Sequence, residues 1–325
     1  MSVSAPARTP ATTGRAPRRA WLIVAIVGLV LLTAASVMVG VADQDWQILT
    51  TSRLPRTAAV MLAGASLAVA GLIMQLLTRN PFVEPATAGT MEFAGLGLVL
   101  VMLTLPGAPI WLRMLAGTAA ALAGSAVFLR LISRLSRGDI LGVPLVGLVL
   151  GGVVGAASTF LAYRNDLVQS LNAWLTGDFS AVISGRYELL WLSGVATVVA
   201  VVVADRFTIA SLGHEVATNL GLDHRRAMAL GMTIVSVISA STVVTVGMLP
   251  FIGLVVPNLV TRIVGGHARR ALPWVLVLGA GATLLCDLVA RTLRYPYELP
   301  IGLVVGVAGG LVFLVMLLRG FDRAH

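Results

Sequence analysis

The sequence predicts an all-α polytopic membrane protein with about ten transmembrane helices, and three observations support this fold class. Apolar residues make up 58% of the 325 positions and charged residues only 11%, whereas a water-soluble domain carries about 25% charged residues. The apolar residues lie in uncharged runs of roughly 20, the length needed to cross a hydrocarbon core about 30 Å thick. Several prolines lie near the ends of these runs, where a missing amide costs little.

The uncharged runs give the predicted spans in chain order. Six precede the longest hydrophilic stretch: 20–42, 57–78, 93–112, 114–129, 140–163 and 189–204. Residues 227–261 contain 35 uncharged positions, too many for one helix, and we expect Gly247-Met-Leu-Pro250 to divide them into two spans. The last two predicted spans are 271 to about 293 and 302–318.

The arginines predict the orientation of the chain. If both termini are cytoplasmic, 16 arginines lie inside and 7 outside, which agrees with the positive-inside rule. Residues 1–19 are expected to form a disordered cytoplasmic tail, and residues 20–325 a single transmembrane domain. The first span is too long for the apolar region of a cleaved signal peptide, so we expect it to remain as an anchor.

The sequence also disfavours several function classes. All 23 basic residues are arginine, so nucleotide binding and covalent chemistry that need a lysine are excluded. His214 and Glu215 open like a zinc-protease motif, but Thr218 stands where the second histidine should be, and Cys286 is the single cysteine. We therefore expect no enzyme activity and no metal or nucleotide bound by this chain. Because the arginines form no basic face, we also expect no nucleic-acid binding.

Two proline-containing stretches echo each other about half a chain apart. They are Asn80-Pro-Phe-Val-Glu-Pro85 and Leu249-Pro-Phe-Ile-Gly-Leu-Val-Val-Pro257. The predicted topology places the first inside and the second outside, as an inverted repeat would. Polar or helix-breaking residues near them are candidates for a polar path through the membrane or for helix caps: Gln75, Asn80, Glu84, Glu92, Pro250 and Asn258.

The later spans carry a charged pair and a glycine face. Asp287 and Arg291 are four residues apart, and a structural ion pair is the simplest account of them, with a proton relay through Asp287 as the alternative. Gly302, Gly306 and Gly310 line one face of the last span. They permit close packing within the chain or, alternatively, a contact between subunits.

The hydrophilic stretch at about 205–226 is expected to lie in the cytoplasm and to contain a short amphipathic helix. Such a helix would fit a groove on a soluble partner, and resting on lipid is the alternative. The residues of interest are Val216, Ala217, Leu220, Gly221, Leu222 and Asp223.

Motifs in order along the chain carry a family resemblance. They are Arg53-Leu-Pro-Arg56, Gly71-x-x-Met74-Gln75, Asn80-Pro81 with Glu84-Pro85, Ala217-x-x-Leu220-Gly221, Pro250-Phe-Ile-Gly-Leu-Val-Val-Pro-Asn258, Asp287-x-x-Ala290-Arg291 and Glu298-Leu-Pro-Ile-Gly302. With these motifs the chain resembles the FecCD-like permeases, the membrane subunits of ABC importers for ferric siderophores, haem and cobalamin. The resemblance covers nearly all of the chain after the amino-terminal tail.

The resemblance implies a type II ABC importer permease fold in the cytoplasmic membrane, with a pore formed by two identical or related permease subunits. It implies two cytoplasmic ABC ATPases, which hold ATP and magnesium and dock on the 205–226 loop. It also implies an extracytoplasmic substrate-binding protein that docks on Arg53, Arg56 and Arg291. Membrane lipid is the remaining partner, and anchoring to lipid headgroups is the alternative role of these arginines.

One departure from the family pattern bears on the substrate. Many relatives have Gly-Val-Ser at the start of the third span, whereas this chain has Gly89-Thr-Met-Glu-Phe-Ala94, which is similar to the branch that imports catecholate-type or related siderophores. We therefore expect a ferric siderophore, with haem or cobalamin as the alternative. A secondary transporter coupled to protons through Asp287 or Glu92, which would need no ATPase, is the competing class.

Overall fold

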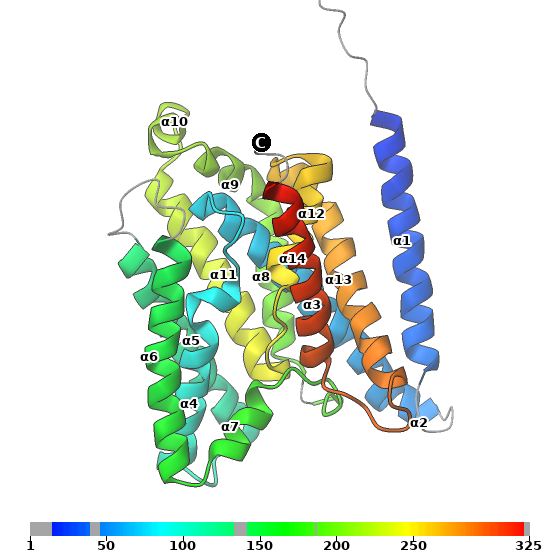
Figure 1. The fold of residues 1–325 in the computed structure, drawn as a ribbon, viewed down its shortest axis with the longest axis vertical. Helices are drawn as coiled ribbons and strands as arrows, with labels where there is room; N and C mark the ends of the chain where they lie inside the picture. The colour runs from blue at the N-terminus through cyan, green and yellow to red at the C-terminus, as the bar shows by residue number, and fades with distance from the viewer. Residues whose placement is uncertain (1–14, 40–45, 133–141, 186, 322–325) are drawn as a thin grey trace, which may run out of the picture.

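The computed structural model describes residues 15–39, 46–132, 142–185 and 187–321, and these ranges are helical with no β-strand (Figure 1). In chain order the elements are α1 (Arg15–Met38), α2 (Trp46–Ile48), the π-helix η1 (Leu49–Arg53), α3 (Leu54–Thr78), the 3-10 helix η2 (Pro85–Ala88), α4 (Thr90–Thr104), α5 (Ile110–Ile132), α6 (Gly142–Arg164), α7 (Val168–Leu175), α8 (Leu190–Val202), α9 (Ala204–Ser211), α10 (His214–Asn219), α11 (His224–Val246), α12 (Ile252–Val264), α13 (Ala268–Thr292) and α14 (Ile301–Phe321).

Seven helical segments of the described chain are long and apolar enough to cross a membrane. They are α1 from Ala20, the continuous segment Trp46–Thr78 that ends with α3, α5, α6 from Leu145, α11, α13 and α14. The pair α8 and α9 passes the same test but is bent by 64°, and α4 and α12 are shorter apolar helices. Each of the ten predicted spans coincides with one of these elements, and ten full crossings remain a prediction.

The predicted amino-terminal boundary is wrong. α1 begins at Arg15, so residues 15–19 of the predicted disordered tail are helical. A first helical turn has free amides in any case and therefore tolerates Pro17. Residues 1–14 of the predicted tail lie outside the described residues.

The predicted boundary between the third and fourth spans is also wrong. α4 ends at Thr104 and not at residue 112, and α5 already begins at Ile110. The segment Leu105-Pro-Gly-Ala-Pro109 explains the difference, because two prolines and a glycine within five residues end a helix. Absence of charge located the runs, but these residues decide where each helix stops.

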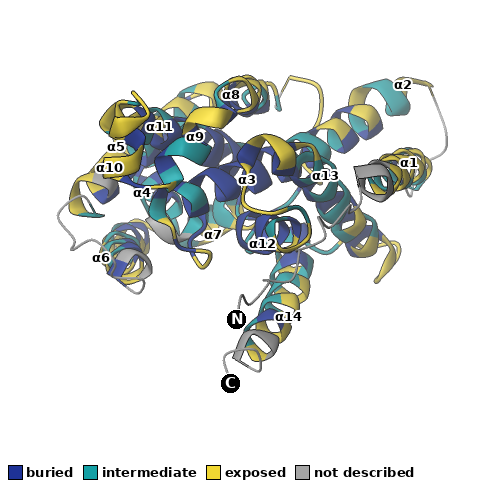
Figure 2. Cartoon of the chain, turned by 90° about the horizontal axis from the view of Figure 1, so that it is seen from above, coloured by how far each residue is buried: buried dark blue, intermediate teal, exposed yellow. Residues whose placement is uncertain are grey.

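α3 forms the centre of the bundle, whereas α1, α6 and α14 lie at its periphery (Figure 2). In the segment that contains α3, 78% of the most apolar window is buried, against 6% for α1. Small residues allow this packing: a Cβ atom on Gly71 would lie 1.8 Å from the carbonyl oxygen of Gly253 in α12. Such close backbone contact is the main source of helix association in lipid, where burial of apolar surface supplies little.

The described chain begins and ends at the same end of the bundle, together with α10, whereas α2 and the end of α13 lie at the opposite end (Figure 1). This is the arrangement that an even number of crossings gives. We call the first the α10 end. We call the second the arginine end, after Arg53, Arg56 and Arg291, which lie there.

Candidate functional site

The two proline-containing stretches meet inside the bundle. Arg79 ends α3 with a left-handed φ of 53°, and the side-chain oxygen of Asn80 accepts a hydrogen bond from the amide of Phe82 at 2.9 Å, which turns the chain back. The second stretch begins α12 at Ile252. We call residues 80–89 and 247–258 together the helix-break joint.

Two amide side chains fasten the helix-break joint. Nε2 of Gln75 in α3 donates to the carbonyl oxygen of Gly253 at 3.2 Å. Nδ2 of Asn258 in α12 donates to the carbonyl oxygen of Pro81 at 2.6 Å. Both bonds satisfy backbone carbonyls at positions where a helix is interrupted, and membrane proteins tolerate interruptions only where protein or water supplies such partners.

Glu84 is the acidic residue of the joint. This carboxylate is buried, and its Oε1 accepts from the amide of Phe251 at the start of α12, at 3.4 Å. The free amides of a first helical turn carry partial positive charge, so a helix start is a favourable site for a carboxylate. The Glu84 carboxyl group thus caps the start of α12 inside the protein.

The sequence-based placement of the two stretches on opposite sides of the membrane is wrong, because both enter the bundle and touch. Their opposite directions agree with the expected inverted repeat. From the joint, α4 runs toward the arginine end and α12 toward the α10 end (Figure 1).

Glu92 lies apart from the helix-break joint. It is half-buried in α4 and faces α6, where a Cβ on Gly151 or Gly155 would lie 3.3 Å from its side chain. The two glycines therefore make room for this carboxylate. The structure separates Glu92 from the five other residues grouped with it as path or cap candidates.

The glycine face of α14 packs inward. A Cβ on Gly302 would lie 2.9 Å from the carbonyl oxygen of Met248, and one on Gly306 would lie 3.6 Å from the ring of Pro250. The glycines therefore serve packing within the chain and place Pro250 against α14. Another face of α14 exposes a row of apolar side chains: Leu303, Val307, Leu311, Leu314 and Leu318.

The helix-break joint encloses little free space. A cavity lined by Glu84, Thr90 and Ser239, among others, has a volume of about 20 Å³. This volume suits about one water molecule. This cavity therefore has no room for a solute much larger than water.

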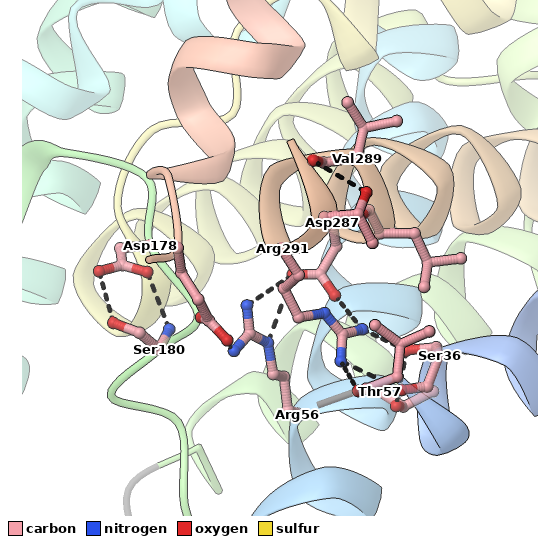
Figure 3. Close-up of polar contacts among 12 residues, drawn as sticks. Ser36, Arg56, Thr57, Asp178, Ser180, Asp287, Val289 and Arg291 are labelled. Carbon is pink, nitrogen blue, oxygen red and sulfur yellow. Dashed lines mark hydrogen bonds and ion pairs between the residues drawn. The ribbon is translucent and has the colours of Figure 1, made fainter. Parts of the chain in front are cut away.

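The arginine end contains a buried ion-pair network (Figure 3). Asp287, fully buried in α13, accepts from Arg291 one turn further along the same helix and from Nη2 of Arg56 in α3 at 2.9 Å. Nη1 of Arg56 also pairs with Oε2 of Glu298 at 2.7 Å. The expected Asp287–Arg291 pair is thus present, and it belongs to a larger network.

Two of these arginines also hold the end of α1. Arg291 donates to the hydroxyl of Ser36 at 2.6 Å, and Nη1 of Arg53 donates to the carbonyl oxygens of Val37 and Met38 at 3.1 and 3.2 Å. The last carbonyls of a helix lack intrahelical partners and carry partial negative charge, so cations stabilise them. α1 makes little apolar contact with the bundle, and these bonds anchor it.

The three arginines proposed to dock a binding protein are therefore engaged within the chain. Arg53 and Arg291 are only 7% and 6% exposed, and the Arg56 side chain is 11% exposed. Asp287 is paired on both carboxylate oxygens, which leaves it poorly suited to a proton relay. Sequence reasoning missed Glu298 and Ser36; Glu298 stands in a quoted motif, whereas Ser36 gave no signal beyond being a hydroxyl in an apolar run.

α10 presents apolar side chains at the opposite end of the molecule. Val216 and Leu220 are 45% and 60% exposed, whereas Ala217 is buried against the bundle. The short helix thus has one face that packs on its own chain and an apolar face that does not. That arrangement is typical of a docking element.

The turn after α10 fixes the position of the helix. Gly221 has a φ of 78°, which favours glycine, and nothing lies within 4 Å of where its Cβ would be. Leu222 packs against the core, and Asp223 caps α11 by accepting from the amide of Arg226 at 3.1 Å. The structure therefore brings together all six residues predicted in this loop.

Among the described residues no group of three or more His, Cys, Asp or Glu side chains could hold a metal ion. His214 and His224 lie close, with ring centroids 5.5 Å apart, but they are only two. The arrangement thus offers helix breaks, a short helix with an exposed apolar face and an ion-pair network, and its described part offers no metal cluster.

Comparisons with known proteins agree with this arrangement. The model of the FecCD transport family matches residues 20–319. The petrobactin import system permease protein YclN of Bacillus subtilis (strain 168) is 43% identical over 302 residues, which cover 90% of this chain and 96% of that protein. The petrobactin import system permease protein FatD of Bacillus anthracis is 40% identical over 302 residues, covering 91% and 90%.

A solved structure has the same fold. It is described as an inward-facing conformation of a metal-chelate type ABC transporter, and the match has a TM-score of 0.81 at 24% identity. The match covers 93% of this chain and 99% of that one. At this identity the likeness concerns the fold alone.

Proposed function

This chain belongs to the FecCD transport family, and on that premise we propose that it is the permease subunit of an ABC importer that carries a ferric siderophore across the cytoplasmic membrane. It is a membrane-spanning transport protein and not an enzyme. The single observation that carries the substrate class is the 43% identity to a petrobactin import permease over nearly the whole of both chains.

The competing functions have less support. Both relatives compared above are named for petrobactin import, which favours a siderophore over haem or cobalamin. A proton-coupled secondary transporter would need a carboxylate free to exchange protons. Asp287 is held by two arginines, which leaves Glu92 beside the glycines of α6, and the match to import-system permeases disfavours this class. We therefore keep ATP-driven import of a ferric siderophore as the function.

In this proposal the α10 end faces the cytoplasm, with both termini there. Two ABC ATPase subunits, which hold ATP and magnesium, dock on α10 of two permease subunits through Val216, Leu220 and the turn at Gly221. Two features support this role: α10 exposes an apolar face, and its residue Ala217 is buried against the rest of the chain. No cofactor is assigned to the permease itself.

A second permease subunit, identical or related, completes the pore. Two observations support this: the cavity at the joint holds about one water molecule, and the outer face of α14 exposes a row of apolar side chains. Between two subunits the path would be largely apolar. Because the siderophore already fills the coordination sphere of iron, such a path needs no metal ligands.

The arginine end then faces the extracytoplasmic binding protein. Arg56 is the arginine best placed to take part, because its partner Glu298 has a side chain 28% exposed. Arg53 and Arg291 contribute by holding the surface in shape. Gln75, Asn80, Glu84, Pro250 and Asn258 act as the joint of the moving parts, and Glu92 faces the α4–α6 contact.

Uptake of labelled ferric petrobactin in cells tests the proposal. We expect uptake to be lost with an ATPase-dead partner and with Leu220→Arg, which places a charge on the apolar face of α10. Glu215→Gln, on the same helix and exposed, is the matched control and should transport normally. Uptake that survives without ATP hydrolysis, with the permease present in the membrane, would contradict the proposal.

A further inference from the structure

Two unusual backbone positions face each other at the α10 end. Arg79 ends α3 in the left-handed region with a φ of 53°, which few residues other than glycine adopt. Gly213, which precedes α10, has a φ of 108°. A Cβ on Gly213 would lie only 2.0 Å from Nη2 and 3.0 Å from Cζ of Arg79. The guanidinium of Arg79 therefore lies directly against the backbone of Gly213, in the space that a side chain would fill.

This contact joins two parts of the molecule that the proposed function requires to move together. Gly213 is the residue that caps the start of α10, and its carbonyl oxygen accepts a hydrogen bond from the amide of Ala217 at 2.8 Å. Arg79 is followed directly by Asn80 and Pro81 of the helix-break joint, and the Pro81 carbonyl oxygen is bound to Asn258. A displacement of α10 thus reaches the joint through one side-chain contact and two residues of backbone.

We propose that Arg79 is a positioning residue that transmits movement of α10 to the helix-break joint through its contact with Gly213. The inference rests on the proposed docking of the ATPase on α10. Coupling between sites is carried by packed side chains and rigid elements, and a claim of such a route needs evidence of energetic coupling. Within the described ranges Arg79 forms no ion pair, so packing against Gly213 places its guanidinium.

The first test measures how many siderophore molecules are transported for each ATP hydrolysed. The transporter, reconstituted with its ATPase and binding protein, is assayed with ferric petrobactin. For Arg79→Ala we expect assembly and ATP hydrolysis near wild type, while transport per ATP falls about tenfold, within the range typical of coupling between sites. Arg206→Ala, an exposed arginine on α9, is the control and should keep the wild-type ratio.

The second test is a double-mutant cycle with a control at the other end of α10. Gly213→Ala introduces both backbone strain and a collision with Arg79. Gly221→Ala, at a φ of 78° with nothing within 4 Å of its Cβ, introduces strain without that collision. We expect the transport defect of Gly213→Ala to shrink about fivefold when Arg79 is alanine, and that of Gly221→Ala to be unchanged, because only contacting residues couple.

The outcomes separate the two proposals. If Leu220→Arg leaves ATPase assembly intact, the docking role of α10 fails whatever Arg79 does. If Leu220→Arg blocks assembly but Arg79→Ala keeps the wild-type ratio, only the role of Arg79 fails. The role of Arg79 would also be overturned if Arg79→Ala reduced the transport defects of Gly213→Ala and Gly221→Ala by the same factor. The double-mutant cycle would then report backbone strain and not the contact with Arg79. Thermal unfolding of each variant shows whether it is folded.

Discussion

The two ends of the bundle differ in which side chains are buried and which are exposed. At the arginine end, charged groups are buried and paired within the chain, with Asp287 fully buried between Arg56 and Arg291. At the α10 end, apolar side chains are left exposed, with Leu220 60% exposed. The two ends therefore differ in how their side chains are satisfied: the buried charges at the arginine end pair with one another. The apolar side chains of α10 are left uncovered by the described part of the chain.

The largest expected effect on stability comes from removing the shared carboxylate. Asp287→Ala leaves Arg56 and Arg291 buried without their counter-ion, and we expect it to lower the free energy of unfolding by about 3–5 kcal/mol. Asp205→Ala, which breaks an exposed pair with Arg269 at the α10 end, should cost at most about 1 kcal/mol. Thermal unfolding of the purified protein measures both losses of stability. Equal losses for the two variants would show that the buried network is no stronger than an exposed ion pair.

A smaller effect is expected from releasing the end of α1. Arg53→Leu removes the hydrogen bonds to the carbonyls of Val37 and Met38, and charged hydrogen bonds of this kind contribute about 1.5–3 kcal/mol. Arg294→Leu, an exposed arginine at the same end, should change stability by no more than about 0.5 kcal/mol. The same unfolding measurement applies, and an Arg53 variant as stable as the Arg294 variant would show that α1 needs no such anchor.

Glu298→Gln tests where the buried network ends. Its side chain is 28% exposed, so losing the pair with Arg56 should cost less than about 1 kcal/mol. The loss should also fade as salt is raised from low to molar concentration, because exposed pairs are screened. The cost of Asp287→Ala should persist at high salt. If the loss of stability caused by Glu298→Gln does not depend on salt, Glu298 belongs to the buried network.

The smallest effect on stability is expected at the α10 end. Val216→Ala with Leu220→Ala should change the free energy of unfolding by no more than about 0.5 kcal/mol, because both side chains are exposed. The affinity for the partner ATPase should nevertheless fall about tenfold or more, as for anchors at the centre of an interface. Binding to the purified ATPase measures this, and an unchanged affinity would remove the evidence for docking on this face.

The sequence predicted the spans because uncharged length is a direct physical requirement of the bilayer. It misplaced the end of α4 because absence of charge does not record where proline and glycine stop a helix. It misplaced the start of α1 because a first helical turn accommodates both the arginines and Pro17. The short helix within the hydrophilic stretch was predicted, since amphipathic spacing and two glycines are local signals.

Contacts between residues far apart in the chain could not be predicted from the spacing of residues in the sequence. The i, i+4 spacing of Asp287 and Arg291 predicted their pair, but nothing local points from Arg56 to Asp287, which is 231 positions away. The same holds for the contact of Glu84 with Phe251 and of Asn258 with Pro81. These contacts depend on how α3, α12 and α13 cross, which close backbone approach at glycines decides.

The most direct test of the central claim uses proteoliposomes that contain this chain with its ATPase and binding protein. Uptake of ferric petrobactin is measured with ATP on the ATPase side and no pH gradient, and again with a pH gradient and no ATP. We expect uptake with ATP and no pH gradient, and we expect Leu220→Arg to abolish it. We expect no uptake with a pH gradient and no ATP. Uptake driven by the pH gradient alone would contradict ATP-driven import.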